Sequence, residues 1–150
     1  MKRRLMIIDD VPAVLQSLRR LFMSSSCAYG QLVYELELEL FESPLAALAR
    51  ARQCAFDAFL CDYRMAEMDG TKFLLQVREL QPDAVQMLIS GNPDHAGVDK
   101  AFEEARVFRF IAKPWDDATL TSAVAEALTY RDVMLEKHKG DSCPIPFKAS

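Results

Sequence analysis

The sequence predicts an α/β fold, a doubly wound parallel sheet of five strands with helices on both faces. Short apolar runs of strand length alternate with stretches of helical periodicity along the chain. Each apolar run is followed by a helical stretch, and such crossovers join parallel strands. With 150 residues the chain is long enough for one domain with a single sizeable core.

Five segments have the length and composition of strands, and they are 5–8, 34–41, 58–61, 85–89 and 107–112. The second strand alternates leucine with glutamate between Tyr34 and Phe41, so it has one apolar and one acidic face. Charged side chains protect a sheet edge from further pairing. The other four strands are apolar enough for the centre of a sheet. This contrast predicts the strand order 2-1-3-4-5, with a ligand site outside the carboxyl ends of the strands.

Helices are expected at 12–22, 43–53, 71–80, 94–106 and 116–137, the first two beginning at a proline. The last helix has a periodic stripe that indicates pairing with a second subunit or continuation as a signalling helix; it consists of Val124, Ala127, Leu128, Arg131 and Leu135. The segment 24–32 is interpreted as a surface elaboration. We expect one domain over residues 1–138, followed over 139–150 by a flexible tail or the start of a linker.

Composition and charge exclude several classes of function. The 18 basic residues are outnumbered by 22 acidic ones, which argues against nucleic acid as a direct partner. No apolar run approaches the roughly 20 residues that span a membrane, and the apolar stretch at the N-terminus is too short for a signal peptide. The four cysteines form no C-x-x-C pair and favour no zinc site. We therefore expect a cytoplasmic protein.

Polar side chains follow four of the strands at their carboxyl ends. They are Asp9 and Asp10 after the first, Asp62 after the third, Ser90 after the fourth and Lys113 after the fifth. Each has an ordinary explanation when taken alone: a helix cap for Asp10, a loop carboxylate, a turn hydroxyl and a surface ammonium. Parallel strands, however, bring these ends to one crevice.

Three converging carboxylates repel one another, and a divalent cation with oxygen ligands relieves that repulsion. Mg²⁺ suits such a site because it takes one or two carboxylates, waters and a phosphate oxygen. The lysine then offers a charge to a phosphoryl group and the serine a hydrogen bond. The pattern indicates phosphoryl transfer to an aspartate.

At these positions the sequence resembles the receiver domains of two-component response regulators, over about residues 3–137. The matching residues are Asp9, Asp10, Asp62 within the stretch 62–70, Ser90, Phe110 and the pair Lys113-Pro114. The resemblance implies a flavodoxin-like fold. It departs from the family at Ala66, where receiver domains usually have proline.

The resemblance also implies a role for each of these residues. Asp62 is the expected phosphoacceptor, and Lys113 is expected to contact the phosphoryl group. Asp9, Asp10, Asp62 and the backbone carbonyl of Arg64 are the expected ligands of Mg²⁺.

Two further pairs follow from the resemblance. Ser90 and Phe110 are expected to form a switch pair, which alters the face made by 94–106, 107–112 and the last helix. Arg64 and Asn92 are expected to modulate the lifetime of the phosphorylated state.

The partners implied are a sensor histidine kinase or a phosphotransfer protein, and a second copy binding through the face of residues 94–137. The output module or partner is expected outside this chain. The stretch 107–117 resembles receivers found ahead of HD-GYP or histidine kinase modules. Such a domain is a signalling phosphoacceptor, which assists its own phosphoryl transfer and dephosphorylation, rather than an enzyme.

Three other functions are compatible with parts of this pattern. A haloacid dehalogenase-type phosphatase also uses a strand-end aspartate with magnesium, but it requires a second aspartate where this chain has Arg64. A flavodoxin-like FMN binder is disfavoured because the acidic loop after the first strand repels phosphate. A receiver-shaped interaction module that works without phosphorylation remains an alternative.

Overall fold

A computed structural model of the chain describes residues 1–91 and 99–137. Its elements, in chain order, are β1 (Lys2–Ile8), α1 (Pro12–Ser24), β2 (Cys27–Tyr29), β3 (Leu32–Phe41), α2 (Pro44–Gln53), β4 (Ala58–Asp62), α3 (Gly70–Leu80), β5 (Val85–Ser90), η1 (Ala101–Ala105), β6 (Arg109–Ala112) and α5 (Asp117–Lys137). Among these described elements, no helix has the length and apolar character needed to cross a membrane.

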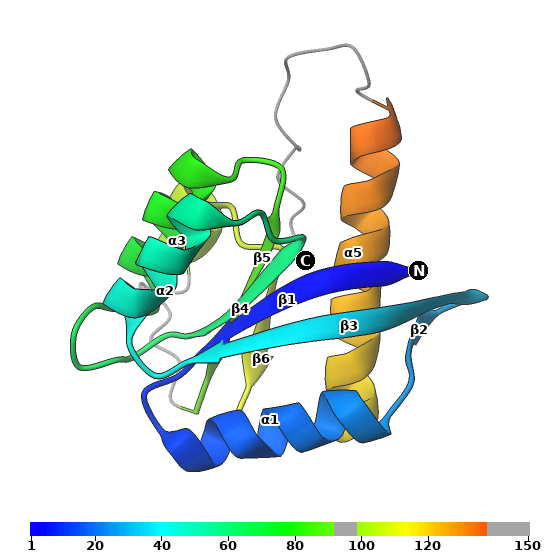
Figure 1. Cartoon of the computed structure of the whole chain (residues 1–150), viewed down its shortest axis with the longest axis horizontal. Helices are drawn as coiled ribbons and strands as arrows, with labels where there is room; N and C mark the ends of the chain where they lie inside the picture. The colour runs from blue at the N-terminus through cyan, green and yellow to red at the C-terminus, as the bar shows by residue number, and fades with distance from the viewer. Residues whose placement is uncertain (92–98, 138–150) are drawn as a thin grey trace.

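The sheet has the order β2-β3-β1-β4-β5-β6. All neighbouring strands from β3 to β6 run parallel, as the alternation of strands and helices predicts. The predicted strand order is therefore confirmed for the five expected strands, which are β3, β1, β4, β5 and β6. Because these strands are parallel, their carboxyl ends all lie at the same end of the sheet (Figure 1).

The predicted strand count was wrong by one, because the segment 24–32 contains a strand. Residues Cys27–Tyr29 form β2, which pairs antiparallel with the first three residues of β3. Gly30 has a φ of +61°, a left-handed conformation that glycine adopts without steric cost, and it turns the chain between the two strands. The acidic strand β3 is thus part of a hairpin rather than the outermost strand along its whole length.

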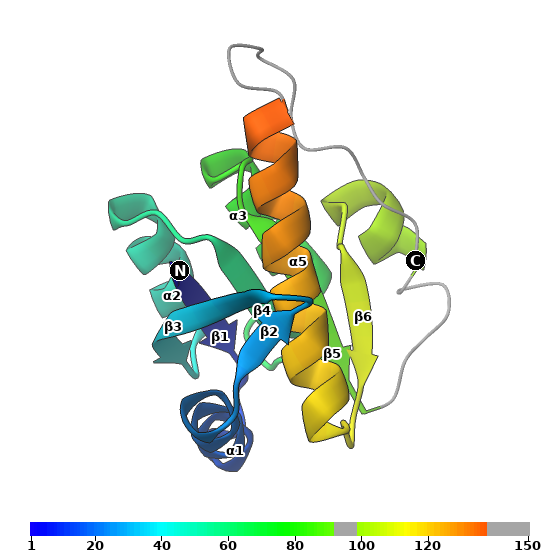
Figure 2. The same ribbon diagram turned by 90° about the vertical axis from the view of Figure 1, so that its right-hand side faces the viewer.

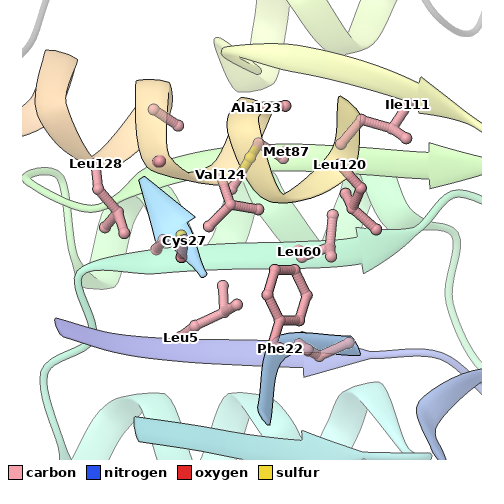
Figure 3. Packing of buried hydrophobic residues seen from close by; sticks show 14 of the residues in the cluster. Leu5, Phe22, Cys27, Leu60, Met87, Ile111, Leu120, Ala123, Val124 and Leu128 are labelled. Carbon is pink, nitrogen blue, oxygen red and sulfur yellow. The ribbon is translucent and has the colours of Figure 1, made fainter. Parts of the chain in front are cut away.

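Helices cover both faces of the sheet, α1 and α5 on one and α2 and α3 on the other (Figure 1). Strand residues alternate between two buried clusters. Leu5, Leu60 and Met87 pack toward α1 and α5, together with Val124 and Leu128 of the last helix (Figure 3). A second cluster packs against α2 and α3 and includes Met6, Phe59, Phe73, Leu74 and Leu88.

The stripe on α5 faces the interior. Val124, Ala127 and Leu128 are fully buried against the sheet and so are unavailable to a second subunit, whereas Arg131 and Leu135 are partly exposed. Strand β2 lies against a further side of α5 (Figure 2). From the other strand of the hairpin, the hydroxyl of Tyr34 on β3 lies 2.8 Å from the hydroxyl of Thr129 on α5. The hairpin therefore covers part of the last helix.

The helix expected at 94–106 is described only from residue 99. It continues into the π-helical turn η1 and ends at Arg106, whose φ is +54°. The beginning of that helix, the predicted site residue Asn92 and the predicted tail 139–150 lie outside the described residues.

Candidate functional site

Three aspartates meet at the carboxyl ends of β1 and β4. Asp9 follows β1 and is fully buried, and its N–H donates to the carbonyl oxygen of Phe41 at the end of β3. Asp62 is the last residue of β4 and is also buried. One carboxylate oxygen from each of Asp9, Asp10 and Asp62 lies within 4.8 Å of the others.

Lys113 reaches two of these carboxylates from the loop after β6. Its Nζ lies 2.9 Å from Asp9 Oδ2 and 2.9 Å from Asp62 Oδ1. The backbone N–H of Lys113 donates to the carbonyl oxygen of Ser90 at 2.8 Å, which fixes the loop against the end of β5. The lysine predicted to be near the aspartates therefore contacts two of them through its side chain, while its backbone is fixed to the end of β5.

Burial and crowding of like charges shape the electrostatics. Burial raises the pKa of Asp62, and the charges of Asp9 and Asp10 raise it further, against the lowering effect of Lys113. Burial alone lowers the pKa of Lys113, but its hydrogen bonds to Asp9 and Asp62 outweigh burial, and the pKa is raised. One ammonium therefore faces three carboxylates, which leaves the site with excess negative charge.

The ordinary explanation for Asp10, a helix cap, does not apply. Val11 is the residue that caps α1, and no side chain makes a capping hydrogen bond there. The N–H of Val11 instead donates to Asp9 Oδ1 at 2.9 Å, and the N–H of Ala66 donates to Asp10 Oδ2 at 2.9 Å. Both carboxylates are thus oriented by backbone donors within the site.

Three further predicted site residues have described positions. Ser90 is buried at the end of β5, and Phe110 on β6 is half-buried against the cluster that packs on α2 and α3. Arg64 is exposed in the loop after β4, with its guanidinium carbon 5.8 Å from the centre of the Tyr63 ring.

Sequence reasoning missed three groups that shape the site: the N–H groups of Val11 and Ala66, and Gly70. A Cβ at Gly70 would collide with the carbonyl oxygen of Asp62 and lie 2.9 Å from Leu88 Cδ2. The start of α3 therefore packs directly against the end of β4. A glycine that opens a helix after an acidic loop is a signal for such a close approach. Backbone donors leave no such signal in a sequence.

The donor set fits a hard divalent cation. The three carboxylates supply oxygen ligands, and the one nearby lysine does not balance their charge. An ion of this kind relieves the repulsion among them.

Residues 5–125 match the family described as the response regulator receiver domain. The chain belongs to that family. This membership excludes the haloacid dehalogenase alternative. Among curated relatives, this receiver domain is 42% identical over 71 residues to the hydrogenase transcriptional regulatory protein HoxA of Bradyrhizobium diazoefficiens. That match covers 47% of the chain and 15% of the relative.

The response regulator protein TodT of Pseudomonas putida is 31% identical over 122 residues, which cover 81% of the chain and 49% of the relative. The chain therefore spans less than half of these curated relatives. A solved structure, the signal receiver domain of an HD domain-containing protein from Pseudomonas fluorescens Pf-5, is 25% identical with a TM-score of 0.77. It covers 89% of this chain and 99% of that one. A receiver domain of an HD domain-containing protein is thus among its structural neighbours.

Proposed function

We propose that this receiver domain is a phosphorylation switch, in which Asp62 accepts a phosphoryl group in a reaction that depends on Mg²⁺. The observation that carries the proposal is the buried Asp62 carboxylate, held by Lys113 beside two further aspartates. Asp9, Asp10, Asp62 and the backbone carbonyl of Arg64 would hold the cation, which would neutralise negative charge on the phosphoryl oxygens.

The residues of the chain supply the rest. An oxygen of Asp62 forms a bond to phosphorus while the bond from phosphorus to the donor breaks. The donor group leaves with the electrons of that bond, and it takes up a proton where its chemistry requires one. Lys113 Nζ moves its contacts from the carboxylates to the incoming phosphoryl oxygens, a point charge where negative charge gathers.

The output follows from the position of the switch pair. The Ser90 hydroxyl bonds to the phosphoryl group, and Phe110 moves into the space that this frees. The shift alters the surface of η1, β6 and α5. On part of this surface, between β6 and the start of α5, Phe110 and Trp115 line an open groove. Arg64 and Asn92 set how long the phosphoryl group lasts by controlling access of the attacking water.

The names of the relatives support a signalling partnership. Several are transcriptional regulatory proteins, and one solved neighbour belongs to an HD domain-containing protein. We infer that the phosphodonor is a sensor histidine kinase or phosphotransfer protein. Phosphorylation then acts on an output module or on a second copy through the surface of η1, β6 and α5.

Intact mass spectrometry after incubation with acetyl phosphate tests this function. We expect a single acid-labile phosphoryl group on the wild type with Mg²⁺, and none with EDTA or in Asp62→Asn. Equal labelling of wild type and Asp62→Asn would refute the assignment of the phosphoacceptor. No labelling of the wild type under any condition would favour the interaction module that works without phosphorylation.

A further inference from the structure

The loop that follows Asp62 is attached to the acidic cluster through one backbone group. The N–H of Ala66 donates to Asp10 Oδ2 at 2.9 Å, across 56 positions of sequence. Lys113 pairs with Asp9 and Asp62, and within residues 1–91 and 99–137 no ion pair involves Asp10. Ala66 N–H is therefore the group that restrains the third carboxylate.

Both sides of this contact are held in place. On the loop side, Met65 is buried, and the N–H of Gly70 donates to the carbonyl oxygen of Tyr63 at 2.7 Å. On the other side, Asp10 follows Asp9, which Lys113 and Val11 N–H anchor. The direction of the Ala66 N–H is thus set by the fold around it.

A hydrogen bond of this kind limits the rotation of a carboxylate. The bond occupies one lone pair on Oδ2 and leaves the other lone pairs of Asp10 for a cation. A proline at position 66 has no N–H and makes no such contact. Loss of a group that orients a metal ligand typically lowers metal affinity or activity by about 10- to 100-fold.

We propose that Ala66 N–H is a positioning group for the cation site, which orients Asp10 and couples cation binding to the conformation of loop 63–69. The proposal rests on the proposed magnesium site and adds a residue to it. By linkage, a loop that favours the cation is itself stabilised when the cation binds.

Removal of this donor without other change tests the proposal. In the full chain, Ala66 is replaced by its α-hydroxy analogue, which turns the amide into an ester and removes only the N–H. We expect Mg²⁺ affinity, measured by calorimetry on metal-stripped protein, to fall about tenfold. Ala66→Pro also removes the N–H and should weaken Mg²⁺ binding. Ala66→Gly keeps the N–H and should bind Mg²⁺ with the affinity of the wild type.

The amide proton of Ala66 gives a readout that needs no variant at position 66. In the wild type we expect it to be protected from hydrogen exchange, more strongly with saturating Mg²⁺, and to lose that protection in Asp10→Ala. If the wild type binds Mg²⁺ and the ester variant binds it equally well, this inference is wrong and the proposed function stands. If the wild type does not bind Mg²⁺, the magnesium site fails, and this inference fails with it.

Discussion

Charged residues of the β-sheet lie in two clusters that differ in their balance of acids and bases. In the cluster around the start of β1, here called the amino end, four carboxylates (Asp57, Asp132, Glu37 and Glu39) pair with four arginines (Arg3, Arg4, Arg50 and Arg131), and Glu37 and Glu39 reach it from β3. At the carboxyl ends, Asp9 and Asp62 share Lys113, and Asp10 lies beside them. The first arrangement balances its charges within the chain, whereas the second has one ammonium for three carboxylates.

Geometry reinforces this difference. Arg3 contacts Asp132 through both Nε and Nη2, at 3.2 Å and 2.7 Å, and Arg50 contacts both oxygens of Glu39. Planar guanidinium groups form such two-point contacts, and a lysine ammonium does not. The amino end therefore holds α5 and β3 in place, while at the carboxyl end the single ammonium of Lys113 contacts one oxygen of each of two carboxylates.

The largest change in stability is expected from a substitution at the amino end. Arg131 Nη1 lies 3.1 Å from Asp57 Oδ1 and 3.1 Å from Asp132 Oδ1, and its Nε donates to the carbonyl oxygen of Asp83. Arg131→Met should lower the free energy of unfolding in urea by about 2 kcal/mol, because partly buried acceptors lose charged donors.

The exposed Arg52 on α2 provides the control for this variant. Arg52→Met should change the free energy of unfolding by less than about 0.5 kcal/mol. An equally small effect of Arg131→Met would show that the amino end contributes little to stability.

Neutralising an acid at the carboxyl end should raise the free energy of unfolding rather than lower it. Asp10→Asn removes one of three like charges and keeps an oxygen that accepts from Ala66 N–H. Without divalent cations we expect a gain of about 0.5 to 1 kcal/mol in the free energy of unfolding. With Mg²⁺ the wild type should become the more stable protein, since only it gains binding energy. A loss of stability in the metal-free variant would contradict an excess of negative charge at this site.

A smaller effect is expected from Glu39, and it depends on pH. The hydrogen bond from Arg50, with the charges of Arg50 and Arg4, lowers the pKa of Glu39. A lowered carboxyl pKa gives stability that is present above the ordinary glutamate pKa and is lost as the pH falls through the folded-state value. Glu39→Gln should therefore cost about 0.5 kcal/mol at neutral pH, and the cost should shrink in acid. Urea unfolding across this pH range checks it, and a cost independent of pH would be inconsistent with the ion pairs.

The acidic face of β3 also shows where sequence reasoning falls short. Alternation of leucine and glutamate indicated a solvated face, yet Glu39 lies between Arg4 and Arg50. Those arginines come from β1 and α2, and no periodicity reveals which distant cation a given acid will meet. The strand β2 was missed for a different reason, because three residues are too few for alternation to be recognised.

The meeting of the site residues at the strand ends, by contrast, follows from the topology of the sheet. Once the apolar runs are recognised as parallel strands, Asp9, Asp62 and Lys113 must lie at the same edge, and the distances between them agree. What the sequence could not predict is the fine orientation of the carboxylates. The N–H groups of Val11 and Ala66 provide it, and their positions depend on the path of two loops.

Equilibrium binding of Mg²⁺ by calorimetry tests the contrast between the two ends most directly. The metal-stripped wild type is compared with Asp10→Asn at the carboxyl end and Glu39→Gln at the amino end. We expect one weak site in the wild type, unchanged in Glu39→Gln and lost in Asp10→Asn, because a site with few carboxylates and several waters binds this ion weakly. Undiminished binding in Asp10→Asn, or no binding in the wild type, would contradict the account.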